Sequence, residues 1–401
     1  MKPLLHSTRN SSSESMLYFL LQWLEEVYHP PGFQVVEFIT VRATLSAITA
    51  FIIVMVIGPY VIRWLVRNQL GEEVRAELGA GAVDHSHKRG TPTMGGLIIV
   101  SAIMIATLLW GDLREVYVWL ILVATIWMAA FGFADDYIKT VHKDKAGLAA
   151  RMKLTGQIGL GLLVGIILYF HPQFEETRAV TDLPFVQNWH LDYNILGNAF
   201  LGGMDLGWLL FIPMTMFIVT ATSNAVNLTD GLDGLAAGIA AITAMGLVVL
   251  TYVSGHAGFS SYLGVLHLTG AGELTIFASA MCVACLGFLW FNGYPATVFM
   301  GDTGSLSLGA AIAVMAVMVK KELLLPLLCA VFFVETLSVI LQTTYFRYTR
   351  RKTGTGKRIF RMAPLHHHYE AKGMHEVKIV TRFCLVTVIT MLATLLSLRI
   401  R

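Results

Sequence analysis

Stretches of apolar residues long enough to cross a lipid bilayer follow one another along most of this chain of 401 residues. Because the hydrocarbon core of a bilayer is about 30 Å thick, a helix needs roughly 20 apolar residues to span it. Only 14% of the residues are charged, whereas soluble domains contain about 25%. The sequence therefore predicts an all-α integral membrane protein. We expect about ten transmembrane helices, the eighth of them short, at Ile39–Trp64, Gly95–Trp110, Val116–Ala134, Leu154–Phe170, Leu206–Val226, Leu235–Val253, Leu274–Phe291, Leu306–Val319, Leu323–Tyr345 and Ile379–Leu398.

The loops between these predicted spans differ in positive charge. The loops after the odd-numbered spans hold 18 Lys and Arg residues, and those after the even-numbered spans hold 4. Positively charged loops stay on the cytoplasmic side, so the odd-numbered loops are predicted to be cytoplasmic and both termini periplasmic. In the largest external loop, His171–Asp205, alternating and turn-forming residues indicate a small hairpin over the outer face.

The rest of the chain adds no second folded domain. Met1–Ser15 is rich in serine and lacks the apolar core of a signal peptide, so we interpret it as a disordered polar extension. Residues 16–401 are predicted to form a single polytopic membrane domain. All four cysteines fall inside predicted spans. Cys282 and Cys285 have the spacing of a redox motif, but in an apolar helix we expect them to be small buried hydrophobic side chains.

One polar segment, Asn224–Gly234, interrupts the apolar pattern between the fifth and sixth spans. It reads Asn-Ala-Val-Asn-Leu-Thr-Asp-Gly-Leu-Asp-Gly and contributes two amides and two carboxylates, those of Asn224, Asn227, Asp230 and Asp233. Ionisable groups at a membrane span are energetically expensive, so such a cluster indicates a functional site. We call this segment the polar island.

Two more acidic clusters follow spans on the predicted cytoplasmic side. Asp135 and Asp136 end the sequence Gly-Phe-Ala-Asp-Asp, and Asp302 lies in Phe-Met-Gly-Asp-Thr-Gly. Any single Asp here could be a helix cap, but three clusters on one side favour a ligand site. Carboxylate oxygens suit hard divalent cations, and Mg²⁺ takes one or two of them together with substrate phosphates.

Cationic side chains on the same side indicate an anionic substrate that carries phosphate. Lys88 and Thr93 precede the second span, and Lys139 follows the third. Lysines beside metal-binding carboxylates can neutralise the charge of a transferred phosphate. The alternative is that the positive-inside rule alone accounts for these bases. No nucleic-acid partner is expected.

Three consecutive histidines, His366, His367 and His368, lie in the basic loop before the last span. Imidazoles can donate hydrogen bonds to phosphate or act as acid or base near neutral pH. Adjacent histidines seldom point at one metal ion, so we favour substrate binding over a metal site. Near Asp302, the amide of Asn292 and the ring of Phe299 suit a nucleobase, which can be stacked and read along its edge.

Together these segments resemble the polyprenyl-phosphate N-acetylhexosamine-1-phosphate transferases. The triple histidine is similar to the branch that transfers phospho-N-acetylmuramoyl-pentapeptide, and the matching motifs run from the second span to the last. The resemblance implies transfer of phospho-N-acetylmuramoyl-pentapeptide from its UDP carrier to undecaprenyl phosphate, which gives lipid I and UMP in peptidoglycan synthesis. It also implies Mg²⁺ dependence, a homodimer and a place in the bacterial inner membrane, with the active-site cleft facing the cytoplasm.

The resemblance also assigns roles to individual side chains. Asp302 would bind Mg²⁺, and Asp135, with Asp136 beside it, would deprotonate or orient the lipid phosphate; His366 joins these three as a catalytic candidate. The uridine would lie among Lys88, Asp233, Asn292 and Phe299. The diphosphate and sugar would contact Lys139, Asn227, Asp230, His366 and His367. Thr93, Asn224 and His368 complete the predicted substrate-binding set.

Several alternatives remain open from the sequence. Direct attack by the lipid phosphate needs only orientation and charge neutralisation, whereas a two-step route would need an aspartyl-phosphate; we favour the single step. A sister transferase would use UDP-N-acetylglucosamine in place of the muramoyl donor. A transporter of polyprenyl lipids should place ionisable groups near mid-membrane, whereas the acids here gather at one face and only scattered groups such as Glu335 interrupt the spans.

Overall fold

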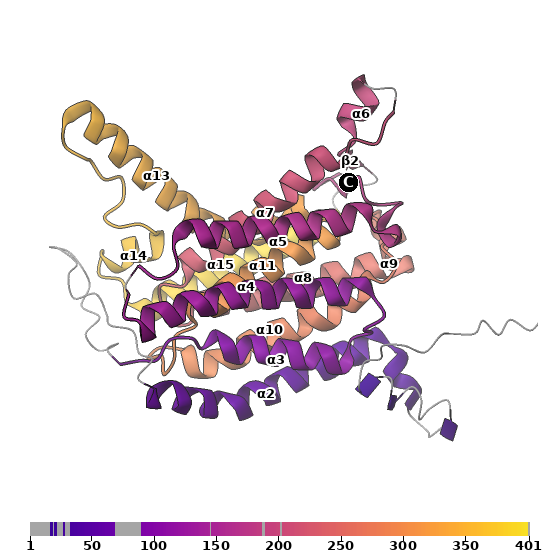
Figure 1. The fold of residues 1–401 in the computed structure, drawn as a ribbon, viewed down its shortest axis with the longest axis horizontal. Helices are drawn as coiled ribbons and strands as arrows, with labels where there is room; N and C mark the ends of the chain where they lie inside the picture. Colours follow the sequence, from indigo (N-terminus) through magenta and orange to yellow (C-terminus); the bar gives the residue numbers. More distant parts are fainter. Residues whose placement is uncertain are drawn as a thin grey trace, which may run out of the picture.

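The protein is a bundle of long helices in the computed structural model, which describes residues 17–18, 20–21, 27–28, 33–68, 90–144, 146–186, 189–200 and 203–399. Figure 1 shows the bundle with its long helices lying side by side. The long helices are α2 (Ile39–Arg67), α3 (Gly96–Trp110), α4 (Val116–Val141), α5 (Ala150–Phe170), α7 (Trp208–Thr229), α8 (Leu235–Gly255), α10 (Leu274–Asn292), α11 (Gly301–Met318), α13 (Ala330–Thr353) and α15 (Glu376–Ser397).

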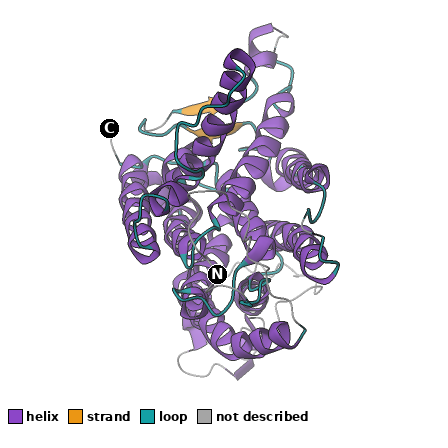
Figure 2. Cartoon of the chain, turned by 90° about the vertical axis from the view of Figure 1, so that its left-hand side faces the viewer, coloured by secondary structure: helices purple, strands orange, loops and turns teal. Residues whose placement is uncertain are grey.

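Short elements connect these helices at the two ends of the bundle. They are η1 (Phe33–Glu37), η3 (Pro172–Phe174), α6 (Ile195–Phe200), α9 (Ala257–Leu263), η4 (Ala271–Glu273), η5 (Glu322–Leu324), α12 (Leu325–Leu328) and α14 (Leu365–Glu370). In Figure 1 α14 lies at the left-hand end of the bundle, whereas α6 and α9 lie at the right-hand end. Figure 2 shows that helices make up most of the described chain.

The predicted class, an all-α membrane protein, is confirmed. Among the described residues, eight helices are long and apolar enough to cross a membrane. The shorter apolar helix α3 matches the second predicted span. The ninth predicted span corresponds to two helical segments, Glu322–Leu328 and α13. The chain bends by 80° at the break between them. The apolar stretch at 17–24, which is too short for a span and was expected to be an interfacial turn, lies partly outside the described residues.

The two helices that carry the acidic motifs extend further than the apolar stretches predicted. We placed the end of the third span at Ala134 and the start of the eighth at Leu306, but α4 continues to Val141 and α11 begins at Gly301. Hydropathy misses these turns because their side chains are polar. They are helical because the N-terminal amides of α11 find acceptors on α4, as described below.

Small side chains let α11 occupy the centre of the bundle. It packs against α4, α7, α3 and α8, and nearly all of its residues are buried. At Gly309 an added Cβ would lie 2.6 Å from the Cα of Ser223 on α7, so only glycine allows this approach. Close backbone contact through Gly, Ala and Ser is typical of helix packing in membranes. The core therefore holds the N-terminus of α11 rigidly at one end.

At the opposite end the predicted hairpin is confirmed. Strands β1 (Val180–Asp182) and β2 (His190–Asp192) pair antiparallel, with Thr181 opposite Leu191. The hydroxyl of Thr181 donates to the carbonyl of Lys320 at 3.0 Å, and Tyr193 donates to Glu322 Oε1 at 2.8 Å. These bonds attach the hairpin to the turn that follows α11.

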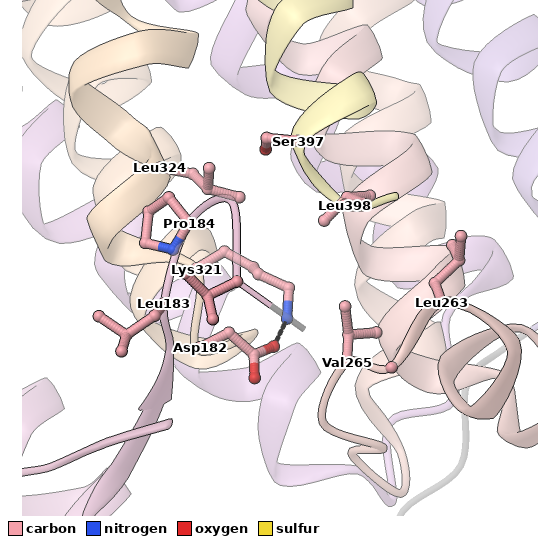
Figure 3. Close-up of a pocket in the computed structure, with 11 residues that line it drawn as sticks. Asp182, Leu183, Pro184, Leu263, Val265, Lys321, Leu324, Ser397 and Leu398 are labelled. Atoms are coloured by element: carbon pink, nitrogen blue, oxygen red, sulfur yellow. Dashed lines mark hydrogen bonds and ion pairs between the residues drawn. The ribbon is translucent and has the colours of Figure 1, made fainter. Parts of the chain in front are cut away.

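A pocket lies between this hairpin, the loop after α9 and the end of α15. Figure 3 shows the ion pair of Lys321 and Asp182 on its wall, with Leu183, Pro184 and Leu398 supplying apolar surface. Lys321 follows the C-terminus of α11, and this helix has 18 residues. At 1.5 Å per residue the pocket is about 27 Å from the acidic end of α11. It is not part of the site described next.

The cysteine interpretation agrees with the structure. Cys282, Cys285, Cys329 and Cys384 are free thiols, and the first three are buried. Burial among apolar helices explains why Cys282 and Cys285, despite their spacing, are unpaired.

Candidate active site

Three carboxylates meet where the C-terminal part of α4 lies against the first turn of α11. One ligand atom each from Asp135, Asp136 and Asp302 lies within 4.8 Å of the others, the one such group of potential metal ligands among the described residues. Their approach depends on Gly132, where an added Cβ would lie only 2.2 Å from the backbone oxygen of Asp302. The missing side chain therefore brings the two helices, and with them the three acids, together.

Asp136 fastens the two helices to each other. Its Oδ1 accepts a hydrogen bond from the backbone N–H of Asp302 at 3.0 Å. Its Oδ2 accepts from the N–H of Thr303 at 2.9 Å and from the Thr303 hydroxyl at 2.7 Å. A carboxylate at a helix N-terminus satisfies amides that have no partner within the helix. Both carboxylate oxygens of Asp136, which is 3% exposed, are therefore bound to the first turn of α11.

Asp135 and Asp302 face two lysines. Lys139 Nζ lies 2.6 Å from Asp135 Oδ2 and 3.4 Å from Asp302 Oδ2. Lys153 Nζ, from the first turn of α5, lies 2.9 Å and 2.5 Å from the same two oxygens. The other oxygen of Asp135 accepts from the N–H of Leu148 at 2.7 Å, which fixes the carboxylate in place. Three carboxylates with two ammonium groups leave one excess negative charge, which suits a further cation.

The polar island lies against this cluster through Asn227. Its side-chain amide donates to Asp302 Oδ1 and to the hydroxyl of Ser305, both at 2.9 Å. Asn224, one turn earlier on α7, donates instead to Gln157 Oε1 at 2.9 Å. Asp230 is the residue after the end of α7 and is half-buried. The island thus contacts the acidic cluster directly through Asn227.

Asp233 and Asn292 hold the turn between α7 and α8. The backbone N–H of Ala296 donates to Asp233 Oδ2 at 3.0 Å, and the N–H of Asp233 donates to Glu376 Oε1 at 2.5 Å. Asn292 accepts from the N–H of Gly234 at 3.1 Å, where φ is +78° and glycine is favoured. Both side chains are at least nine-tenths buried, so the structure places them as supports of the loops around the predicted uridine site.

Thr93 and Phe299 lie at the edge of this region. Thr93 is buried, and its hydroxyl lies 2.9 Å from where a Cβ on Gly301 would be. The backbone of Phe299 bridges two segments, accepting from Gly95 and donating to Pro92, both at 2.8 Å. Its half-buried ring remains a candidate stacking surface. Lys88, the remaining residue predicted to contact uridine, lies outside the described residues.

The three histidines differ in environment. His366 is fully buried, and burial lowers the pKa of its imidazole. His367 Nδ1 pairs with Glu370 Oε2 at 2.9 Å. His368 Nδ1 accepts from the backbone N–H of Arg361 at 3.0 Å, and partial burial together with the charges of Lys372 and Arg361 lowers its pKa. The rings of His366 and His367 lie 4.2 Å apart, yet the three side chains do not form one metal site.

Comparison with known proteins identifies the family of this chain. Residues 118–320 match the model of glycosyl transferase family 4, and residues 88–100 match phospho-N-acetylmuramoyl-pentapeptide-transferase signature 1. The phospho-N-acetylmuramoyl-pentapeptide-transferase of Salinibacter ruber is 60% identical over 386 residues, which cover 96% of this chain and 100% of the relative. The chain belongs to the phospho-N-acetylmuramoyl-pentapeptide transferase family.

More distant members of this transferase family align over the same share of the chain. The proteins of that name from Chloroherpeton thalassium and Flavobacterium psychrophilum are 50% identical over 386 residues and 45% identical over 412 residues. Each alignment covers 96% of this chain and 100% of the relative. The resemblance predicted from the motifs is therefore confirmed.

The structure adds three residues that were not among the predicted site residues of this transferase. Lys153 contacts two of the three acids, whereas the sequence pointed only to Lys139 among the bases that follow Asp136. Glu335, on α13, lies against His366, and Glu376, at the start of α15, holds the backbone of Asp233. A signal was available for Glu335 and Glu376, since an ionisable residue within or next to a membrane span requires a partner.

Proposed function

We propose that this chain transfers phospho-N-acetylmuramoyl-pentapeptide from UDP-N-acetylmuramoyl-pentapeptide to undecaprenyl phosphate, releasing UMP and forming lipid I for peptidoglycan synthesis. The observation that carries the proposal is the joint placement of Asp135, Asp302, Lys139 and Lys153 at one end of the bundle. Identity over the full length of relatives with this activity in their name supports the choice of substrate.

The site supports a direct displacement. An oxygen of the lipid phosphate forms a bond to the sugar-proximal phosphorus, and the bond from that phosphorus to the bridging oxygen breaks, leaving UMP. Asp135 is held by Leu148 and two lysines, so it can orient the incoming lipid phosphate or accept its proton. Lys139 and Lys153 neutralise charge on the diphosphate as UMP departs. Detection of a phosphorylated Asp with the nucleotide substrate alone would favour the two-step alternative.

The acidic cluster fits the predicted Mg²⁺. Its ligand atoms are carboxylate oxygens without thiolate or imidazole, the set that hard cations prefer. Asp136 uses both oxygens on the amides of α11, so Asp302, with Asp135 beside it, is the ligand we propose. When bound there, Mg²⁺ would screen the negative charge of the diphosphate and polarise its phosphorus–oxygen bonds. Lys139 and Lys153 contact the same oxygens, so they would shift to make room.

We extend the proposal to the remaining predicted residues. Asn227, Asp230, His366 and His367 line the side on which we place the diphosphate and sugar. Phe299, with Asp233, Asn292 and Thr93 behind it, would form the uridine pocket together with Lys88. Asn224 supports α7 through Gln157 and stands further from the acids. His368 supports its own loop through Arg361. These assignments are hypotheses that single substitutions can test.

The membrane arrangement is part of the proposal. Counting α3 and the bent pair with the eight long helices gives about ten spans, which place both termini in the periplasm under the positive-inside rule. The acidic end then faces the cytoplasm, where the UDP donor is found, and the β1–β2 hairpin faces the periplasm. Residues 16–401 form one domain in the inner membrane, residues 1–15 a polar extension, and the family resemblance implies a homodimer.

Purified protein in detergent tests the reaction. UDP-N-acetylmuramoyl-pentapeptide, undecaprenyl phosphate and Mg²⁺ should together yield UMP and lipid I, and UDP-N-acetylglucosamine should not replace the donor. Release of UMP only from UDP-N-acetylglucosamine would instead identify the sister transferase. Asp302→Asn should abolish turnover without unfolding the protein. Asp144→Asn, a change at an exposed carboxylate on the same side, is the matched control and should retain full activity.

A transporter of polyprenyl lipids is the competing class. It would require ionisable groups along a path through the bundle. In the described residues the acidic cluster lies at one end of α11, whose interior is apolar or small. Movement of lipid across vesicles without UMP release would favour the transporter over our proposal.

A further inference from the structure

Glu335 is a buried carboxylate within the membrane-spanning part of α13. Its side chain is 1% exposed, as is that of His366, and the two residues meet although α13 and α14 are separate helices. Glu335 Oε1 accepts a hydrogen bond from the backbone N–H of His366 at 3.1 Å. Glu335 Oε2 lies 3.3 Å from His366 Nδ1. Burying a carboxylate within a membrane span costs free energy, so its presence there indicates a functional role.

On its other side His366 rests against the polar island. An added Cβ on Gly231 would lie 2.3 Å from His366 Nε2, so the absence of a side chain at Gly231 makes room for the imidazole. His366 Nε2 is buried and has no hydrogen-bond partner among the described residues. Gly231 lies between Asp230 and Asp233, which we assign to the nucleotide-sugar. The imidazole therefore lies between Glu335 of α13 and Gly231 of the polar island.

The chemistry of the pair selects one tautomer. An ionised carboxylate only accepts hydrogen bonds, and a neutral imidazole donates from one nitrogen and accepts at the other. With Glu335 facing Nδ1, the proton belongs on Nδ1 and the lone pair on Nε2. Nδ1 and Glu335 Oε2 are 3.3 Å apart, and neither atom has another hydrogen-bond partner among the described residues, so they suit each other as donor and acceptor. The orienting carboxylate of catalytic histidines and metal-ligating histidines works in the same way.

We infer that Glu335 is a positioning residue that fixes His366 with Nδ1 protonated, so that Nε2 faces the nucleotide-sugar as a hydrogen-bond acceptor or base. This inference rests on the proposed function, since it gives a task to a histidine that we place at the diphosphate and sugar. Glu335 itself does not touch substrate. It acts through His366 and through the loop that the backbone hydrogen bond holds in place.

Charged and titratable groups from three directions determine when His366 takes up a second proton. Glu335 faces it from α13, His367 and Glu370 lie on its own helix, and the carboxylates of the island flank Gly231. Burial, the largest effect, lowers the pKa of His366, while Glu335 opposes this shift and His367 adds to it. Removing the charge of Glu335 should therefore lower the pKa of His366 further. The acidic limb of the pH profile of kcat/KM should move to lower pH.

Glu335→Gln is the test variant because it retains shape and the acceptor for the backbone N–H of His366. Its amide would donate to Nδ1 and impose the opposite tautomer. We expect kcat/KM for the UDP donor to fall about 10–100-fold, the acidic limb to move to lower pH, and KM for undecaprenyl phosphate to stay unchanged. Ser338→Ala, one turn along α13 and equally buried, should leave all three values at the wild-type level.

A double-mutant cycle separates this inference from the proposed function. Glu335→Gln in a His366→Ala background should cost no further activity. If the two losses multiply, or if the acidic limb does not move, Glu335 does not act through His366 and the inference is wrong while the transferase assignment stands. If His366→Ala is fully active, the inference is also wrong. If the wild-type protein releases no UMP from its donor, the proposed function itself fails.

One measurement needs no substitution at Glu335. In wild-type protein labelled with ¹⁵N-histidine, assigned by comparison with His366→Asn, the His366 ring should carry its proton on Nδ1 at neutral pH. A proton on Nε2 would overturn the inference, even if Glu335→Gln does not fold.

Discussion

Gly132→Ala is the substitution for which the structure predicts the clearest effect. The new Cβ would lie 2.2 Å from the backbone oxygen of Asp302, 2.5 Å from its carbonyl carbon and 2.6 Å from the Cα of Thr303. All three contacts are with backbone, so no side-chain rotation can relieve them. Carbon atoms need about 3.5 Å, so α4 and α11 must separate by about 1 Å at this point.

This separation would loosen the site more than the fold. Overpacking of a core typically costs about 1–3 kcal/mol in the free energy of unfolding. The hydrogen bonds from the amides of Asp302 and Thr303 to Asp136 are 3.0 and 2.9 Å long. Lengthening by about 1 Å takes them beyond hydrogen-bonding distance. A misplacement of about 1 Å can reduce a rate about 10²-fold, which corresponds to about 2.7 kcal/mol in the barrier.

The assay is UMP release under saturating donor and lipid, with the thermal unfolding midpoint measured in the same detergent. Gly159→Ala is the matched control, because its Cβ would meet only Trp127 at an ordinary 3.6 Å. We expect full activity for Gly159→Ala and a loss of about 10²-fold for folded Gly132→Ala. Activity of Gly132→Ala within about twofold of wild type would refute the argument that this contact sets the geometry of the acids.

Three other predictions concern the site lysines, the metal ion and the buried Lys320. Lys153→Met should lower kcat/KM about 10²–10³-fold. The loss should be at least as large as in Lys139→Met, because Lys153 Nζ is the closer of the two to Asp302. A change below threefold would exclude a role of Lys153 in the reaction. Chelation of divalent ions should stop turnover and Mg²⁺ should restore it, with a weaker apparent affinity in Asp135→Asn; persistent activity in chelator would contradict the metal assignment. Burial lowers the pKa of Lys320 to about 8. Between this value and the 10.5 of the unfolded chain the unfolded state binds more protons, so the protein should gain stability as pH rises. The gain in unfolding midpoint from pH 7.5 to 9.5 should be smaller in Lys320→Met, and an equal gain in both proteins would contradict the shift.

Much of the fold could be predicted from hydropathy because a bilayer imposes a length on each apolar helix. The hairpin at 180–192 was also predictable, since turn residues and alternation are local properties. The C-terminal end of α4 and the N-terminal start of α11 were not, because these turns are polar and are held together by contacts between the two helices. The bend before α13 likewise leaves no mark in the apolar pattern.

The candidate site, like the fold, could be predicted from the sequence only in part. The sequence determined which acids, amides and histidines interrupt the membrane spans, and the motifs around them indicated the family. It could not tell that Asp136 holds α11 while Asp135 faces the lysines, because adjacent residues in a helix point in different directions. Nor could it rank Lys153 above the other bases, since its contact with Asp302 joins positions 149 residues apart.

What the sequence by itself determined is therefore the chemical type of the residues that interrupt the apolar spans, and the family to which their motifs belong. The tertiary structure decided the pairing: Gly132 against Asp302, Asn227 on Asp302, and Glu335 beneath His366. The physical reason is that each pairing depends on the distance between helices. That distance is set by small side chains packed across the bundle, a property that no single segment contains.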